Sequence, residues 1–335
     1  MRRRRSSGPL LRGALCAAVA LAGAGPIRLQ AQSAADEGAL FLLLPVGARS
    51  VARGQAVVAS RESGSEAVWW NPAGLAAVTR TEAAIHHSQS LFGTGDALTL
   101  VVPSSVLGVI AASVNVLTLA ETPVTDSVEG TEIGTAVTRG VVYAASYATN
   151  VVQRVSAGLT YKIVQFRTDC SGTCPDELTR TATTSALDFG TQFSFQAGAP
   201  VVVGVAVRNL GVRLQVNDSP QSDPLPSRIQ VGAQVLLVPP ERYGSDFDVR
   251  IGVDVVDELE VHRPAARLGT DVAWQRRAHL RLGYAFEGGG SLGGGPSLGL
   301  GLVRGGLAID IARVVSGLSA DAGQAPTYLS LRYAF

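Results

Sequence analysis

The chain has 335 residues, of which 46% are hydrophobic and only 16% charged, with a formal net charge of +1. After the first 30 residues, no run reaches the roughly 18 uninterrupted apolar residues of a membrane-spanning helix, which argues against a helical membrane protein. The apolar residues instead come in short runs, which favours strands.

The N-terminus has the features of a secretory signal peptide, residues 1–31. A basic stretch, MRRRRSSGPLLR, precedes the small and apolar run GALCAAVALAGAG, and a cleavage zone lies near Ala31. A membrane anchor is the alternative, but the apolar run is short and interrupted by Gly and Pro. Cleavage would leave 22 basic against 27 acidic residues, a net charge of about −5. A nucleic-acid partner is therefore not expected.

Residues 32–78 do not alternate between polar and apolar positions, unlike the rest of the chain. The stretch AVWWNPAGLA places two tryptophans before an Asn-Pro turn, in which Pro72 fixes its own φ and Gly74 is free to adopt unusual conformations. We expect a hatch-like segment with its turn at Trp70, Asn71, Pro72, Ala73 and Gly74. The alternative is a periplasmic lead-in whose tryptophans lie at a membrane interface.

From residue 79 to 335 the sequence alternates with period two, between turn signals. In DFDVRIGVDVVD, Phe247, Val249, Ile251, Val253 and Val255 face one way and polar residues the other. About 14 such segments begin near residues 80, 96, 107, 138, 152, 181, 200, 227, 246, 264, 278, 296, 305 and 326. Alternating segments of about ten residues, in even number, are typical of a transmembrane antiparallel β-barrel, so the predicted fold class is all-β.

The connections alternate in length, as they do in outer-membrane barrels with long extracellular loops and short periplasmic turns. Long loops are expected around 118–136, 168–179 and 211–226, whereas turns such as TN, GA and RG are short. A soluble sandwich or propeller would also contain many short strands. Such a soluble fold would not need an export signal, alternating loop lengths and an aromatic C-terminus together. We therefore expect the protein to be located in the cell outer membrane.

Charged residues fall on the polar face of their strands, which we expect to face the lumen. A charge facing lipid would cost about 2–4 kcal/mol near the midplane. They could line a permeation path or form an ion-pair lattice that braces the barrel. The predicted lumen-facing charges are Arg228, Arg250, Asp254, Arg267, Asp271, Arg281, Asp310 and Arg332.

The last segment, TYLSLRYAF, ends the chain on an aromatic residue. It must pair with the first strand to remove the open edges of the sheet, because an unpaired edge in lipid is costly. Its alternating Leu331, Tyr333 and Phe335 also resemble the signal that the barrel-assembly machinery reads.

Residues that could carry chemistry are sparse. Cys170 and Cys174 are too isolated for a zinc site and are expected to form a disulfide in an exported chain. The four histidines are scattered, and His86 and His87 point to opposite faces of one strand. No nucleophile-elbow motif accompanies the serines. We therefore expect that the protein is not an enzyme and that it has no catalytic residue, metal site or cofactor site.

The stretches GARSVARGQAVVA and AVWWNPAGLA resemble the N-terminal signature of the PorV/PorQ family, which belongs with the FadL-type (long-chain fatty-acid transporter-like) barrels. AASYATN, AGLTYKIVQFR and DPLPSRIQVGAQ extend the resemblance over most of the mature chain. It implies a 14-stranded barrel whose N-terminal hatch bears the Asn71-Pro72-Ala73 turn.

The resemblance implies two functions. A short hatch and modest loops favour the PorV-type function, in which the barrel supports protein secretion or surface transport by binding secreted cargo or secretion-system proteins through its loops. The alternative is a FadL-type channel for hydrophobic small molecules such as long-chain fatty acids. A continuous apolar pocket beside the hatch would favour the channel, and a packed, polar lumen would favour partner binding. Outer-membrane lipid is an expected partner in both cases.

Overall fold

The computed structural model describes residues 38–91, 93–126, 130–174, 180–215, 222–238, 246–259, 264–286, 294–315 and 323–335. All of them belong to one compact unit, Ser33–Phe335. The predicted signal peptide, residues 1–31, lies outside the described residues.

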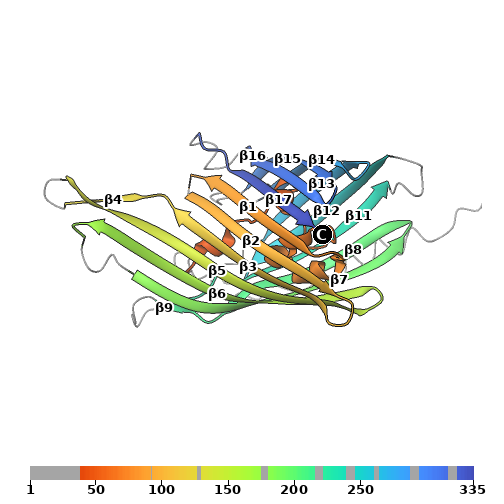
Figure 1. The fold of residues 1–335 in the computed structure, drawn as a ribbon, viewed down its shortest axis with the longest axis horizontal. Helices are drawn as coiled ribbons and strands as arrows, with labels where there is room; N and C mark the ends of the chain where they lie inside the picture. Colours follow the sequence, from red (N-terminus) through yellow and green to blue (C-terminus); the bar gives the residue numbers. More distant parts are fainter. Residues whose placement is uncertain are drawn as a thin grey trace, which may run out of the picture. The chain divides into compact units, whose positions relative to one another are not determined.

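Fourteen antiparallel strands form a closed barrel (Figure 1). Each pairs with its neighbours in sequence, β3 pairs with β5, and β1 pairs with β17 to close the ring. This confirms the predicted fold class. The barrel strands are β1 (Glu82–Ser90), β2 (Gly93–Ser104), β3 (Gly108–Leu119), β5 (Glu132–Val152), β6 (Val155–Gly172), β7 (Arg180–Ala197), β8 (Ala199–Gly211), β11 (Arg228–Val238), β12 (Phe247–Glu258), β13 (Ala265–Trp274), β14 (Ala278–Phe286), β15 (Gly295–Arg304), β16 (Leu307–Val314) and β17 (Thr327–Ala334).

The period-two sequence pattern gives each strand an apolar outer face and a buried inner face. On β12, Phe247, Val253 and Val255 are about half exposed, whereas Asp248 and Asp254 are buried. Lipid can cover the exposed apolar row, and the polar row avoids the cost of facing lipid. Polarity at alternate positions therefore sets which face of each strand points inward.

The two ends of the barrel differ in their connections. At the end that holds the C-terminus, β5 and β6, β7 and β8, and β15 and β16 are joined by one- or two-residue turns. At the other end the structure departs from the predicted loops. β5 begins at Glu132 and β6 runs to Gly172, so parts of the expected loops 118–136 and 168–179 are strand, and β4 (Thr122–Thr125) pairs with the extended β5. Alternation of small and β-branched residues continues there, which favours strand over loop.

Strand β17 closes the barrel. It pairs with β1 from Thr327 to Ala334, and the backbone N–H of Phe335 donates to the carbonyl of Thr81 at 2.9 Å. Leu331, Tyr333 and Phe335 point outward with 42–62% of their surface exposed, and the rings of Tyr333 and Phe335 stack at 5.8 Å. The seam therefore presents an apolar row that ends in two aromatic rings to the outside of the barrel.

The segment that precedes β1 folds into short helices inside the barrel (Figure 1). These are η3 (Leu40–Leu43), α2 (Ala48–Ala52), η4 (Gly64–Glu66), α3 (Ala67–Trp70) and η5 (Pro72–Ala77). Among the described residues, no helix is long and apolar enough to cross a membrane. A small two-stranded sheet, β9 (Leu214–Gln215) with β10 (Ser222–Asp223), stands between β8 and β11.

Candidate functional site: the hatch inside the barrel

The Asn-Pro turn anchors the hatch to the wall. Asn71 caps η5, because its Oδ1 accepts from the N–H of Ala73 at 3.0 Å. Its Nδ2 donates to the carbonyl of Val58 at 2.6 Å and lies 3.4 Å from the carbonyls of Thr191 and Val205 on β7 and β8. One amide side chain thus links two parts of the hatch to two strands.

Glycines on the inner wall make room for this turn. Gly158 on β6 and Gly190 on β7 are directly paired across the strands. A Cβ on Gly190 would collide with the Asn71 side chain, and one on Gly158 with the backbone of Pro72. The wall and the Asn-Pro turn are therefore complementary in shape, and a side chain at either glycine would displace the hatch.

A second anchor holds the chain just before η4. Gln192 on β7 donates from Nε2 to the carbonyls of Val58 at 3.0 Å and Ser60 at 3.1 Å. Asp254 on β12 accepts from the N–H of Val58 at 2.9 Å and from Gln230 at 2.8 Å. These buried bonds satisfy backbone groups that the short helices leave unpaired.

Four of the predicted charges form one buried lattice. Asp310 accepts from Arg281 at 2.7 Å and from Arg332 at 2.9 Å, and Arg281 also contacts Asp271 at 3.0 Å. Arg49 of the hatch lies 3.9 Å from Asp310. The lattice therefore joins β13, β14, β16 and β17 to the hatch.

The other predicted charges lie on the same inner side. Arg228 pairs with Glu258 at 2.5 Å, Arg250 contacts Glu62 of the hatch at 3.2 Å, and Arg267 is 1% exposed. Arg53 of the hatch reaches Gln234 of β11 at 2.5 Å. Most of the polar interior thus braces the barrel and holds the hatch.

Glu66, which the sequence analysis did not single out, is fully buried within the hatch. Its carboxylate accepts from the N–H of Ser50 at 2.9 Å, from the Ser50 hydroxyl at 2.5 Å and from the N–H of Arg49 at 3.2 Å. Burial nevertheless raises the pKa of Glu66 to about 7, because desolvation outweighs these donors and the nearby Arg49. Only its position before AVWW marked it in the sequence.

Residues 38–45, which we call the upper segment, have a different character from residues 46–78, the lower segment. The upper segment carries Phe41, Leu42, Leu43 and Leu44, and Phe41 packs against Phe166 with ring centroids 6.5 Å apart. It lies toward the end with long connections, where Gly38 donates to the carbonyl of Pro224 at 3.0 Å. Phe41 and Leu42 pack against the apolar core of the barrel.

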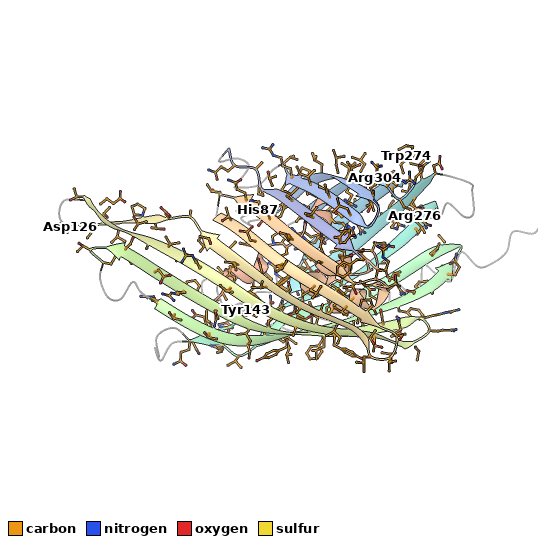
Figure 2. All side chains as sticks on the ribbon, viewed as in Figure 1. His87, Asp126, Tyr143, Trp274, Arg276 and Arg304 are labelled. Carbon is orange, nitrogen blue, oxygen red and sulfur yellow. A yellow bond between two sulfur atoms is a disulfide. The ribbon has the colours of Figure 1, made fainter. Side chains whose placement is uncertain are left out.

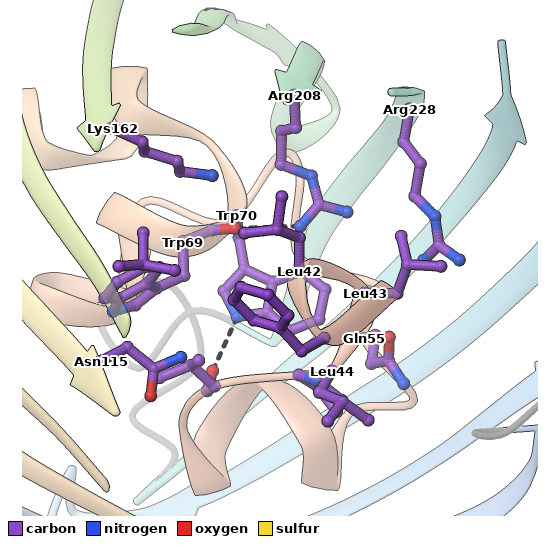
Figure 3. A pocket seen from close by; sticks show the side chains of 14 residues that line it. Leu42, Leu43, Leu44, Gln55, Trp69, Trp70, Asn115, Lys162, Arg208 and Arg228 are labelled. Atoms are coloured by element: carbon purple, nitrogen blue, oxygen red, sulfur yellow. Dashed lines mark hydrogen bonds between the residues drawn. The ribbon is translucent and has the colours of Figure 1, made fainter. Parts of the chain in front are cut away.

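A small pocket separates the upper segment from the tryptophans of α3 (Figure 3). Leu42, Leu43 and Leu44 line it together with Trp69 and Trp70. The indole of Trp70 donates to the carbonyl of Val46 at 2.9 Å, which fixes its ring. The free space is about 20 Å³, room for a water molecule but far below the roughly 150 Å³ cavity that holds benzene.

Three basic side chains line the same pocket (Figure 3). Lys162 pairs with Asp188 at 2.6 Å, and Arg228 pairs with Glu258. Arg208 lies 5.1 Å from the Trp70 ring centre and donates to the Trp69 carbonyl at 2.9 Å, but has no carboxylate partner among the described residues. Asp188 and Asp254 attract Arg208 without contacting it, and Arg228 and Arg267 repel it, so this buried position favours an anion. The sequence analysis missed Lys162 and Arg208 because their strands gave no sign of the pocket.

The cysteine pair lies apart from the hatch, whereas His86 lies beside it. Cys170 and Cys174 are joined by a disulfide at the end of β6, with Cα atoms 6.2 Å apart. His86 faces inward and contacts Ser330 at 2.7 Å, whereas His87 faces outward and contacts Asp96 at 2.7 Å. Within the described ranges, no group of three or more His, Cys, Asp or Glu could hold a metal ion.

Comparison with known proteins places the fold. No family model matches the sequence, and no curated protein matches it significantly. The toluene transporter TodX of Pseudomonas putida matches with a TM-score of 0.58 and 11% identity, over 87% of this chain and 99% of that chain. The toluene transporter TbuX of Ralstonia pickettii gives 0.53 and 12%, over 88% and 100%. The CymD monoaromatic hydrocarbon channel gives 0.54 and 12%, over 88% and 98%. The chain therefore has the same barrel fold as these solved transporters and channel.

Proposed function

We propose that this protein passes hydrophobic small molecules across the outer membrane. The carrying observation is the pocket between the upper segment and Trp69 and Trp70, which is lined by apolar and basic side chains and lies inside a closed barrel. Passage requires the upper segment to move, because the present space is too small for a hydrocarbon. Its apolar contacts favour such movement, since a hydrophobic ligand can replace them at little cost.

We further propose amphiphiles with an anionic head, such as long-chain fatty acids, as the substrates. Arg208 supplies a buried positive charge without a carboxylate partner among the described residues, beside the leucines that would contact an alkyl chain. A fatty acid would offer both a carboxylate and a chain. The solved relatives with this fold are named for toluene and monoaromatic hydrocarbons, so a neutral substrate is the natural competitor.

Uptake in intact cells tests the proposal. In a host without its own hydrophobic-uptake barrel, the full chain should raise entry of radiolabelled oleate at least tenfold over the empty vector. Arg208→Gln should lower oleate entry while toluene entry is unchanged, and Arg213→Gln, at an exposed arginine, should alter neither. Entry of toluene alone would refute the fatty-acid class, and entry of neither molecule would refute the channel.

Binding of secreted cargo or secretion-system proteins is a second candidate. It is favoured by β5, β6 and β7, which have 21, 18 and 18 residues against 8–13 in the other barrel strands. β4 and the Cys170–Cys174 disulfide shape the far end of this extension. The polar packing of the lower lumen agrees with this candidate too.

Mass spectrometry of the barrel purified from outer membranes separates the two candidates. Secreted proteins or secretion components that are lost when residues 122–136 are shortened would favour partner binding. Bound fatty acids that are released by Asn71→Ala would favour the channel.

A further inference from the structure

A row of arginines follows the short turns at the C-terminal end of the barrel. Arg276 and Arg277 lie in the turn between β13 and β14, Arg304 ends β15, and Arg80 precedes β1. All four are exposed. Short turns and the C-terminus mark the periplasmic end of an outer-membrane barrel, so this row stands at the inner leaflet.

Backbone contacts bring these arginines into one band, which we call the arginine rim. The N–H of Val303, next to Arg304, donates to the carbonyl of Arg277 at 2.7 Å. Arg80 donates to the carbonyl of Ala334, and its guanidinium lies beside Gly306 in the next turn. Two neighbouring turns and the entry to β1 therefore present their charges along one edge.

The positive charge of the arginine rim is concentrated at Arg277 and Arg304. Asp248 accepts from Arg276 at 3.4 Å and from Arg250 at 3.1 Å, and the backbone carbonyl of Asp246 accepts from Gln275. Glu62 and Glu82 line a pocket with Arg80 and pair with Arg250 and Arg332. Arg277 and Arg304 have no carboxylate partner within the described part of the chain. The rim thus attracts anions.

The backbone of one turn is strained where it carries this charge. Gln275 and Arg276 both have positive φ, 49° and 56°, which costs a residue with a side chain about 1–2 kcal/mol. The neighbouring turn between β15 and β16 also reverses the chain with two residues of positive φ, but there they are Gly305 and Gly306, at φ 58° and 91°. Chain reversal alone therefore does not explain an arginine at position 276.

Aromatic side chains lie directly above the rim on the lipid face. Trp274 and Phe247 are cross-strand partners, and each is 48% exposed. In Figure 2, Trp274, Arg276 and Arg304 lie at the end of the barrel opposite Asp126. Exposed tryptophan beside basic residues is typical of the boundary between acyl chains and headgroups.

We propose that the arginine rim binds the phosphate headgroups of anionic phospholipids in the inner leaflet, with the acyl chains against Trp274 and Phe247. Charge complementarity requires an anion, and the apolar wall that begins at Trp274 requires an occupant with an apolar part. An anionic phospholipid meets both conditions, whereas a soluble acidic protein meets only the first. The inference does not depend on what passes through the lumen.

Fluorescence of Trp274 provides the test. The chain has three tryptophans, and Trp69 and Trp70 are buried in the lumen at 7% and 3% exposure, so lipid quenchers report mainly on Trp274. The full chain is refolded into phosphatidylcholine vesicles that contain a minor fraction of brominated phosphatidylglycerol or brominated phosphatidylcholine. Brominated phosphatidylglycerol should quench more strongly, by a preference of about fivefold per engaged arginine, and the preference should fall as salt rises.

The double variant R277Q/R304Q should lose most of this preference, whereas Arg139→Gln, on the outer face toward the opposite end, should keep it. Heat-modified gel mobility confirms that each variant is folded. The measurement is repeated in phosphate buffer and in chloride buffer of equal ionic strength. If the rim captures free phosphate rather than lipid, the preference for brominated phosphatidylglycerol should disappear in phosphate buffer only. Equal quenching by both lipids in the unmodified chain, or an unchanged preference in R277Q/R304Q, would overturn the proposal.

Discussion

The two segments of the hatch are held in the barrel by different forces. The lower segment is fixed to the wall by directional hydrogen bonds from Asn71 to β7 and β8, from Arg53 to Gln234 and from Val58 to Asp254. The upper segment rests on apolar contacts such as that of Phe41 with Phe166. Directional buried bonds specify one position, whereas apolar contacts can be exchanged for those of a ligand. The lower segment is thus a fixed base and the upper segment the part that a substrate can displace.

The largest effect is expected where the wall lattice meets the lower segment. Asp310→Asn removes a buried charge shared by Arg281 and Arg332, which leaves these cations with only Asp271 and Glu82. We expect a loss of about 3–5 kcal/mol in the free energy of unfolding. Urea titration of the barrel in bilayers, followed by tryptophan fluorescence, measures it.

Asp169→Asn is the matched control. Asp169 pairs with Arg139 and Arg167 on the outer face, where both arginines are at least half exposed, so its removal should cost less than about 1 kcal/mol. Equal losses for the two variants would contradict the view that the interior lattice fixes the barrel.

A pH dependence should follow from Glu66. Because its folded pKa is raised, the folded state retains the proton while the unfolded chain releases it, so stability is greatest below about pH 4.5 and falls until the pH passes about 7. We expect this group to remove roughly 2–3 kcal/mol between pH 5 and pH 8.

Urea titrations across this pH range, on the full chain and on Glu66→Gln, test the assignment. The variant should show a weaker decline, whereas Glu132→Gln, at an exposed position, should behave like the unmodified chain. A decline of the same size in Glu66→Gln would place the titrating group elsewhere.

A smaller effect is expected at the Asn-Pro turn. Asn71→Ala removes the helix cap and the bond to the Val58 carbonyl, for a cost of about 2 kcal/mol. Hydrogen exchange of residues 67–78 should accelerate accordingly. Asn150→Ala, which removes a single 3.4 Å contact to the carbonyl of Ala76, should leave that exchange nearly unchanged, and similar acceleration in both would deny Asn71 a special role.

Much of the barrel could be predicted from the sequence, because lipid outside and polar groups inside impose a period of two on every strand. Fourteen strands are present, and segments predicted to begin near 246, 264 and 278 correspond to β12, β13 and β14. The length of β5 was missed because the Gly, Thr and acidic residues of 118–136 were interpreted as a loop, although small and β-branched residues continue to alternate from residue 133 onward.

The site was less accessible to sequence reasoning. Asn71-Pro72 marked a turn, but its neighbours Gly158 and Gly190 lie about 90 and 120 residues further along the chain, and only strand register brings them beside it. Arg208 and Lys162 come from strands far apart in the sequence, and Trp69 and Trp70 join them only once the hatch is inside. The period-two pattern predicts which face of its strand each residue lies on, but it does not predict which residue it contacts across the lumen.

The smallest effect, and the sharpest test of the comparison, concerns the upper segment. Phe41→Ala removes the ring contact with Phe166, at a cost of about 1 kcal/mol, and enlarges the space beside Leu42 and Trp69. Exchange of residues 38–45 should accelerate several-fold, while exchange of residues 67–78 stays constant, and Phe41→Leu should behave almost like the unmodified chain. Because the lower segment has its own bonds to β7, β8 and β12, we expect it to stay in place when the upper segment is loosened. Parallel acceleration of both segments would mean that the hatch moves as one body, and a substrate would then have to break the buried polar bonds as well as the apolar contacts.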